Sequence, residues 1–246
     1  MIKDACENCE CCQEDLESYC EKGIYTYNNT DKDGTRTYGG YSDKIVVYQR
    51  FVLKIPENLP PASIAPLLCA GITVYSPMQY YGMTELTVSG KHLGITGLGG
   101  LGHVAVKFGK AFGLKVTVIS TSPKKEDEAI KVLGADRFLV STDASQLKAA
   151  KGSMDFIIDT VSAVHALNPL LGLLKVNGKL VTVGIPDKPL ELSTSSLIFG
   201  SGRRLVGGSN VGGMKETQEM LDFCGKHGIT AEIELIKIDY INEAMK

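Results

Sequence analysis

The stretch that decides the fold is Gly97-Leu98-Gly99-Gly100-Leu101-Gly102, which has the form G-x-G-x-x-G. The apolar run before it, residues 92–96, predicts a strand, and residues 103–112 after it predict a helix. In this context Gly97 can take the turn geometry, Gly99 lets backbone N–H groups approach a pyrophosphate, and Gly102 lets the helix pack against the strand. We therefore predict a dinucleotide site at the helix N-terminus. A glycine-rich turn without a ligand is the alternative.

The next strand predicts which dinucleotide is bound. Residues 115–119 (K-V-T-V-I) predict a buried strand, and an NAD-binding fold usually ends this strand in an acid that binds the ribose 2′-hydroxyl. Here the strand is followed by Ser120-Thr121-Ser122-Pro123-Lys124-Lys125. Hydroxyls and two ammonium groups suit a 2′-phosphate, which a carboxylate would repel. We predict NADP(H) rather than NAD; the alternative is a solvated helix N-terminus capped by Ser122.

Strands and helices continue to alternate after this point. The pattern predicts helices at 124–133, 144–150 and 165–174, and strands at 137–140, 154–159, 179–183 and 205–209. Such alternation predicts an α/β fold with a doubly wound parallel sheet of the Rossmann type, covered by helices on both faces. Ligands of these sheets bind at the carboxyl ends of the strands, so we expect Thr160 and Gly184 on the cofactor side.

A cluster of cysteines near the start of the chain has metal-ligand spacing. Cys6, Cys9, Cys12 and Cys20 are spaced C-x2-C-x2-C-x7-C, and four thiolates suit tetrahedral zinc in a closed structural site. Cys11 is left over, because using it in place of Cys12 would break the even spacing. An iron–sulfur cluster or redox-active thiols are the alternatives. The long last gap and the absence of a proline after Cys20 disfavour the cluster.

Composition limits the class of protein. The chain of 246 residues has room for one large or two modest domains, and its net charge of -2 indicates no nucleic-acid or anionic-membrane partner. There is neither an apolar run of spanning length nor a signal-peptide pattern, so we expect a soluble, cytoplasmic protein. Seven cysteines without an export signal favour metal ligation over disulfides.

The flanking segments are less regular. Residues 25–43 predict a hairpin or surface loop, 42–51 a strand, and 62–75 a helix after the turn at Pro60-Pro61. That helix contains Cys69, which by its apolar surroundings alone would be an inert core cysteine. Residues 214–226 predict an amphipathic helix with Met214, Met220, Leu221 and Cys224 buried, followed by a strand at 232–238 and a helix at 240–246.

Several motifs together resemble the plant cinnamyl alcohol dehydrogenase family of zinc-dependent medium-chain dehydrogenases. They are the four-cysteine segment, Y-G-G-Y-S at 38–42, P-L-L-C-A-G-I-T at 66–73, the stretch 97–107 and G-M-K-E-T at 213–217. The family also contains mannitol dehydrogenase-like enzymes and reductases of terpenoid and alkaloid substrates. The resemblance implies an NADP(H)-dependent zinc alcohol dehydrogenase that interconverts an aldehyde and its alcohol, as a homodimer.

The resemblance also implies roles for individual residues. The four spaced cysteines match the structural zinc ligands, and Cys69 matches one ligand of the catalytic zinc. The positions that match those lining NADP in the family are Thr73, Gly97, Leu98, Gly99, Gly100, Leu101, Gly102, Ser120, Thr121, Ser122, Lys124, Lys125, Thr160, Gly184, Ser209, Asn210 and Val211.

Departures from the family pattern reduce the activity that is expected of this chain alone. The family's other catalytic zinc ligands and a proton-relay hydroxyl precede the cysteine segment and have no counterpart here, nor do the last strands of the catalytic domain. Residues 199–204 contain a short insertion. We therefore expect a fragment, truncated at both ends, with a catalytic zinc only if the missing ligands are present. A zinc-independent iminium or alkene reductase and a non-catalytic NADP-binding module are the alternatives.

The expected domain organisation follows from these segments. Residues 1–61 would form part of a GroES-like catalytic domain carrying the zinc lobe, and residues 62–211 the NADP-binding Rossmann domain. Residues 212–246 would return toward the catalytic domain.

Overall fold

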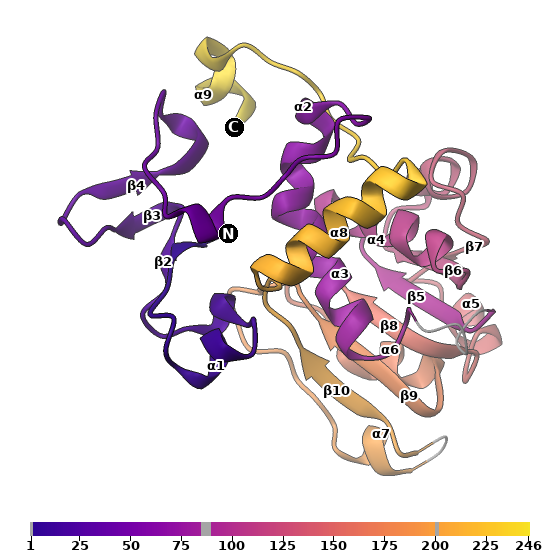
Figure 1. Cartoon of the computed structure of the whole chain (residues 1–246). Helices are drawn as coiled ribbons and strands as arrows, with labels where there is room; N and C mark the ends of the chain where they lie inside the picture. The colour runs from indigo at the N-terminus through magenta and orange to yellow at the C-terminus, as the bar shows by residue number, and fades with distance from the viewer. Residues whose placement is uncertain (1, 85–89, 200–201) are drawn as a thin grey trace.

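The computed structural model describes residues 2–84, 90–199 and 202–246. Its centre is a parallel sheet of six strands in the order β10-β9-β8-β5-β6-β7 (Figure 1). The strands are β5 (His92–Thr96), β6 (Lys115–Ser120), β7 (Arg137–Val140), β8 (Met154–Asp159), β9 (Leu174–Thr182) and β10 (Leu205–Gly208). This is the doubly wound order, so the predicted Rossmann-type α/β fold is confirmed.

Both faces of the sheet are covered, because its strands bury alternate side chains on opposite sides. Ile158 and Val181 belong to a core shared with helices α3 (Ala70–Tyr80), α4 (Gly100–Ala111) and α8 (Met214–His227). Ile157 and Leu180 belong to a second core, shared with α6 (Leu167–Leu173). The remaining helices near the sheet are α5 (Ala144–Ala149) and α7 (Ser195–Ile198). The predicted helix at 124–133 is confirmed as a continuous helical segment made of the 3-10 turn η6 (Pro123–Lys125), residues 126–127 and the π-helix η7 (Glu128–Val132).

Strand register brings the strand ends that matter for function to one edge. Thr96 at the end of β5 is aligned with Asp159 at the end of β8, which in turn is aligned with Thr182 at the end of β9. Thr182 is aligned with Gly208 at the end of β10. The loops that follow these strands therefore start side by side along the carboxyl edge.

The N-terminal part lies to one side of the sheet (Figure 1). Strands β1 (Ile2–Asp4) and β2 (Ile24–Tyr25) pair around a loop that contains α1 (Glu10–Gln13) and η1 (Glu17–Tyr19). We call residues 6–20 the cysteine lobe. The hairpin predicted within 25–43 is confirmed as β3 (Tyr27–Thr30) and β4 (Arg36–Tyr38), and η2 (Gly39–Tyr41) and η3 (Gln49–Phe51) follow.

Two predicted strands are wrong. Residues 42–51 are extended and then turn into η3, and residues 232–238 are irregular until η8 (Ile238–Tyr240) and α9 (Ile241–Ala244). Alternating apolar residues form a strand only beside a partner, and within the described ranges neither segment has one. Val46 and Leu235 are consequently 86% and 80% exposed.

The predicted helix at 62–75 is divided in the structure. It consists of α2 (Pro61–Ile64), η4 (Ala65–Leu68) and α3, with a break at Cys69, whose φ and ψ are -123° and -71°. The helix expected at 165–174 begins two residues later, at Leu167, and ends one residue early. Strand β9 runs through Asn177, which adopts φ +63° at an irregularity in the strand. The insertion within 199–204 includes residues 200 and 201, outside the described ranges.

No single helix in the described ranges is long and apolar enough to cross a membrane. The consecutive helices over Pro61–Leu68 and Ala70–Tyr80 reach that length and composition only as a pair bent by 54°, and their Ile64, Leu67 and Ile72 side chains belong to the core of the sheet domain.

Candidate functional site

The glycine turn between β5 and α4 is closed by contacts that only glycine allows. Gly97 has φ +88°, and its N–H donates to the carbonyl of Ile119 at 2.9 Å. A Cβ on Gly102 would collide with the carbonyl oxygen of Gly97. The strand and the helix therefore approach each other as closely as the sequence pattern predicts.

The other two glycines of the turn face open space. A Cβ added to Gly99 or Gly100 would meet no atom within 4 Å. They lie at the start of α4, a helix of twelve residues, whose first N–H groups have no acceptor within the helix. Open space beside unpaired N–H groups at the positive end of a helix fits a phosphate or pyrophosphate.

Lys125 lies directly against this turn. It follows β6 in the chain, yet its Nζ donates to the carbonyl of Leu98 at 3.0 Å and lies 3.5 Å from a carboxylate oxygen of Glu128. Lys124 and Thr121 are exposed beside it. No Asp or Glu occurs in residues 120–125, so Lys124 and Lys125 provide two ammonium groups at this edge of the site, beside the single carboxylate of Glu128.

The alternative role for Ser122, as a side-chain cap, is not what the structure shows. Ser122 is the residue before η6, but its side chain makes no cap hydrogen bond. Its backbone N–H instead donates to Oγ of Ser120 at 3.2 Å. The hydroxyl of Ser120 therefore orders the loop that carries the two lysines.

The loops after β8 and β9 complete one wall of the turn. Thr160 donates from Oγ1 to the carbonyl of Thr96 at 2.8 Å, and the same oxygen lies 2.8 Å from a Cβ placed on Gly97. A Cβ on Gly184 would collide with the carbonyl of Val161. Thr160 and Gly184 thus lie at the glycine turn, at the edge where the sequence places them.

The loop after β10 connects this edge to α3. A Cβ on Gly212 would lie 2.8 Å from Cδ1 of Ile72, so the loop passes the first turn of α3. Thr73 in that turn donates from its hydroxyl to the carbonyl of Cys69 at 2.7 Å. Cys69 is exposed, which corrects the expectation from composition alone that it is a core cysteine.

Polar residues of the cysteine lobe hold the loop after β10, and sequence reasoning missed them. The N–H of Asn210 donates to the hydroxyl of Tyr19 at 2.9 Å, and the hydroxyl of Ser18 donates to the carbonyl of Val211 at 2.6 Å. Ser209 donates from its N–H to the carbonyl of Thr182 at 3.3 Å. The two contacts with the cysteine lobe join residues 191 and 193 positions apart, so no local pattern could indicate them.

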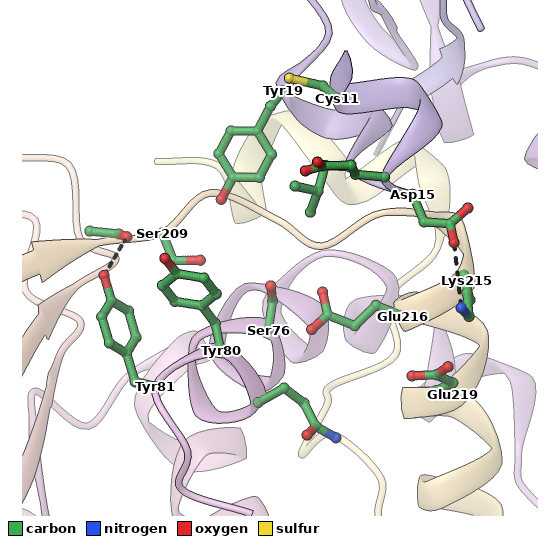
Figure 2. A pocket seen from close by; sticks show the side chains of 14 residues that line it. Cys11, Asp15, Tyr19, Ser76, Tyr80, Tyr81, Ser209, Lys215, Glu216 and Glu219 are labelled. Atoms are coloured by element: carbon green, nitrogen blue, oxygen red, sulfur yellow. Dashed lines mark hydrogen bonds and ion pairs between the residues drawn. The ribbon is translucent and has the colours of Figure 1, made fainter. Parts of the chain in front are cut away.

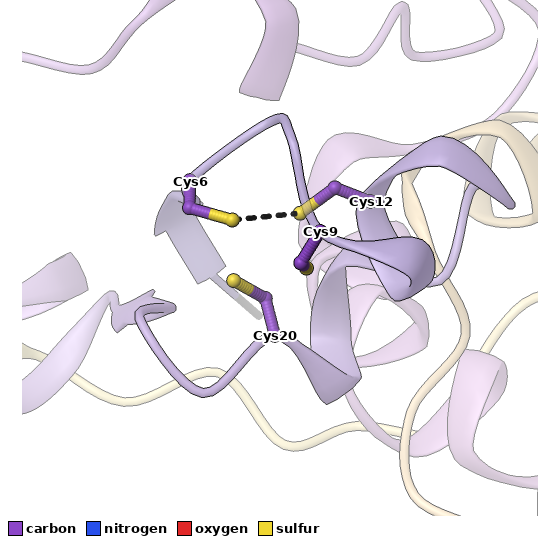
Figure 3. A group of neighbouring side chains, drawn as sticks. All are labelled: Cys6, Cys9, Cys12 and Cys20. Carbon is purple, nitrogen blue, oxygen red and sulfur yellow. Dashed lines mark hydrogen bonds between the residues drawn. The ribbon is translucent and has the colours of Figure 1, made fainter.

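The four spaced cysteines converge (Figure 3). The Sγ atoms of Cys6, Cys9, Cys12 and Cys20 all lie within 4.8 Å of one another, and those of Cys6 and Cys12 are 3.9 Å apart. A tetrahedron with zinc–sulfur bonds of about 2.3 Å has sulfur–sulfur edges of about 3.8 Å. The arrangement therefore fits a closed four-thiolate zinc site. Cys11 is not part of this group, as its spacing predicts.

The pKa values of two thiols in this group are shifted in opposite directions. The backbone N–H of Asn8 lowers the pKa of Cys6 to about 6, whereas burial raises the pKa of Cys12 to about 12. Four thiolates this close repel one another unless a cation lies between them, which is the state that zinc provides.

A buried carboxylate attaches the cysteine lobe to helix α8. Glu17, whose side chain is 2% exposed, accepts from the N–H of Met214 at 3.1 Å and from Nη2 of Arg50 at 3.1 Å. Met214 is the first residue of α8, so the carboxylate lies at the positive end of that helix. The predicted buried residues of α8 are confirmed.

A cavity of about 710 Å³ separates the cysteine lobe from α3 and α8 (Figure 2). Tyr19 and Cys11 lie on its lobe side, Tyr80 on α3 and Glu216 on α8 (Figure 2). None of the residues of the glycine turn line it. Burial raises the pKa of Glu216. The cavity arises from tertiary packing and has no signature in the sequence.

A known protein family matches the chain from the glycine turn through most of helix α8. Residues 100–226, just over half of the chain, match the family described as zinc-binding dehydrogenase. The chain belongs to this zinc-binding dehydrogenase family. Within the family it is of the plant cinnamyl alcohol dehydrogenase and mannitol dehydrogenase type, as the sequence motifs indicate.

Named relatives of this dehydrogenase are similar along its whole length. A probable mannitol dehydrogenase of Stylosanthes humilis is 70% identical over 246 residues, which cover all of this chain and 68% of the relative. Cinnamyl alcohol dehydrogenase 2 of Arabidopsis thaliana is 65% identical, and 64% of its length is covered. The chain therefore spans about two thirds of the length of these relatives.

Solved structures of similar dehydrogenases agree with the fold. A cinnamyl alcohol dehydrogenase from Sorghum bicolor, 54% identical, has a TM-score of 0.94 over 99% of this chain and 68% of its own. A structure from Helicobacter pylori, 38% identical, has a TM-score of 0.88 over the same shares of the two chains and is described as complexed with NADP(H). The family and fold predictions are confirmed, whereas the individual coenzyme and catalytic residues stay predictions.

Proposed function

We propose that this chain carries the NADP(H) site of a zinc alcohol dehydrogenase of the cinnamyl alcohol dehydrogenase type. Such an enzyme transfers hydride reversibly between an aldehyde, of the cinnamyl, allylic or terpenoid kind, and its alcohol. The observation that carries the proposal is the glycine turn, which is open at Gly99 and Gly100 and has the Lys125 ammonium against its Leu98 carbonyl. The NADP(H) of the related Helicobacter pylori structure supports it.

Different residues of the chain would bind different parts of the coenzyme. Free N–H groups at residues 99–102 would bind the pyrophosphate, and Lys124 and Lys125 with the hydroxyls of 120–122 would bind the 2′-phosphate. Thr160, Gly184 and the 209–211 loop line the edge over which the rest of the coenzyme would extend, and Thr73 lies on the neighbouring turn of α3. The reduced nicotinamide supplies the hydride when it is bound.

Two zinc roles belong to this proposal. Zinc in the cysteine lobe has a structural role, because four thiolates leave no open position for a substrate. Cys69 is proposed as a ligand of the catalytic zinc, which polarises a carbonyl when bound. A catalytic zinc needs three protein ligands, and within residues 2–84, 90–199 and 202–246 Cys69 joins no group of three metal-binding side chains.

That observation favours a second candidate for the isolated chain. A polypeptide with the coenzyme turn but only one ligand at Cys69 would bind NADP(H) without zinc-dependent turnover, or reduce an iminium or alkene without zinc.

We propose that the chain is divided into domains at residues 1–61, 62–211 and 212–246. We further propose that it forms a homodimer and is located in the cytoplasm.

Coenzyme binding and turnover on the same sample distinguish the candidates. NADPH fluorescence is titrated first, and oxidation of NADPH by cinnamaldehyde is then followed before and after chelation of zinc. Binding with chelator-sensitive turnover supports the zinc dehydrogenase, and binding without such turnover supports the second candidate. Absence of NADPH binding would contradict both.

A further inference from the structure

A buried carboxylate and a histidine form a pair at the edge of the proposed coenzyme site. Asp159 is the last residue of β8, and its side chain is completely buried. Its Oδ2 lies 2.9 Å from Nε2 of His165, whose side chain is 19% exposed and lies in the loop before α6. The imidazole therefore separates the carboxylate from solvent.

The second ring nitrogen of His165 also faces an oxygen. Its Nδ1 lies 2.9 Å from the carbonyl of Ala163, which can only accept a hydrogen bond. An ionised Asp159 can likewise only accept, so both ring nitrogens must then carry a proton. If Asp159 is instead protonated, it donates to Nε2 and the ring stays neutral. In either case the pair holds one proton more than a free carboxylate and a neutral imidazole.

The surroundings of the pair favour keeping this proton. Burial raises the pKa of Asp159, and the imidazole of His165 in the neighbouring loop acts in the opposite direction without cancelling that rise. The other oxygen of Asp159 accepts from the N–H of Val161 at 3.2 Å. A buried Asp159 carboxylate without a positive or hydrogen-bonding partner would be costly in free energy. The shared proton, together with the hydrogen bonds to His165 and Val161, removes that cost.

The loop spanned by the pair, residues 160–164, supports the glycine turn. Cγ2 of Val161 lies 3.1 Å from a Cβ placed on Gly97, and its carbonyl leaves no room for a Cβ on Gly184. Val161 therefore lies between two glycines proposed to line the coenzyme. Its N–H is held by Asp159, and His165 holds both Asp159 and the carbonyl of Ala163.

We propose that His165 is a positioning residue for the coenzyme: by sharing a proton with Asp159 it fixes residues 160–164 against the glycine turn. This inference rests on the proposed function, because it assigns a role at that same coenzyme edge. Loss of the shared proton leaves a ring nitrogen lone pair facing an oxygen acceptor. The loop then loses one of its hydrogen bonds, and NADPH binds more weakly as the pH rises.

The test combines the protonation state of His165 with the affinity for NADPH. Nitrogen-15 NMR of the imidazole reports whether one or both ring nitrogens carry a proton, and His165→Gln assigns the signal. Gln retains an N–H donor but does not titrate, and His227→Gln on the exposed end of α8 is the matched control.

We expect both His165 nitrogens to be protonated at neutral pH, or Asp159 to carry the proton. The Kd for NADPH should rise about three- to tenfold as this proton is lost, the effect of one net hydrogen bond. His165→Gln should remove that pH dependence, and His227→Gln should keep it. If His165→Gln does not fold, Asp159→Asn serves instead, and the same pH dependence should disappear.

Other outcomes overturn the inference. A singly protonated His165 beside an ionised Asp159 at neutral pH would contradict the shared proton, and an unchanged pH profile in His165→Gln would contradict its positioning role. Absence of NADPH binding at every pH would refute the proposed function and this inference together. Binding with either of the first two results would refute this inference alone.

Discussion

Lys125, in the helical turn η6 after strand β6, reaches the glycine turn after the neighbouring strand β5, where its Nζ donates to the carbonyl of Leu98 at 3.0 Å. The contact joins two segments that helix α4 and strand β6 separate in the sequence. It places a cation beside N–H groups that already favour an anion. The proposed preference for NADP(H) over NAD(H) depends on this ammonium group.

Replacement of Lys125 should change coenzyme preference. We expect Lys125→Glu to weaken NADPH binding by about tenfold or more, because a charge-assisted hydrogen bond is replaced by repulsion of the 2′-phosphate. NADH, which lacks that phosphate, should lose much less. Lys131→Glu, at an exposed lysine paired with Asp127, is the control. Equal losses for the two coenzymes in Lys125→Glu would contradict the assigned phosphate position.

Two glycines of the turn should respond differently to a side chain. Gly99→Val should fold normally, since its Cβ meets nothing within 4 Å, yet it should abolish NADPH binding by filling the space for pyrophosphate. Gly102→Ala should lower the melting temperature, because its Cβ collides with the Gly97 carbonyl. Thermal unfolding and NADPH titration check both. Unaltered NADPH affinity in a folded Gly99→Val would show that the coenzyme does not bind over this turn.

The cysteine lobe should hold one zinc through four particular thiolates. Cys12→Ser should lower the zinc content from one per chain toward none and destabilise the lobe, whereas Cys11→Ser should keep the metal. Elemental analysis after chelator washing measures this. Retention of zinc in Cys12→Ser, or its loss in Cys11→Ser, would contradict the ligand set. A second zinc in the unmodified chain would indicate that Cys69 has further ligands.

Glu216, which lines the cavity, should make the stability of the chain depend on pH. Its pKa is raised by burial, so the folded chain binds more protons than the unfolded chain between the two pKa values. Stability is therefore lost as the pH rises through that window. We expect Glu216→Gln to be more stable than the unmodified chain at pH 8, with the difference disappearing at pH 4.

Denaturant unfolding at the two pH values checks this expectation, with Glu57→Gln, at an exposed glutamate that does not act on Glu216, as the control. A stability difference for Glu216→Gln that is the same at both pH values would mean that packing, rather than ionisation, causes it.

Local patterns were sufficient to predict the sheet domain. The strands at 92–96, 137–140 and 154–159 have the predicted bounds, because each is a short, mainly apolar run bounded by turn residues. The two central strands, 92–96 and 154–159, are also buried, as is typical of parallel sheets. The four clustered cysteines were found because their spacing within one short loop is itself the signal. Helix α4 begins at Gly100 rather than 103, since glycine weakens the helical pattern without preventing the helix.

Features that depend on distant partners could not be predicted in this way. Residues 42–51 and 232–238 have strand-like patterns, but a pattern does not reveal whether a neighbouring strand is present. The bond from Met214 to Glu17 joins residues 197 positions apart, and the pair of Asp159 and His165 depends on how a loop turns back on its own strand. Such contacts follow from the assembled fold.

The most direct test of the central claim is calorimetric titration of the purified chain with NADPH and with NADH at the same ionic strength. The account predicts one NADPH site per chain, with NADPH bound about tenfold or more tightly than NADH, as expected for a 2′-phosphate held by charge-assisted hydrogen bonds. No binding of either coenzyme, or tighter binding of NADH, would contradict it.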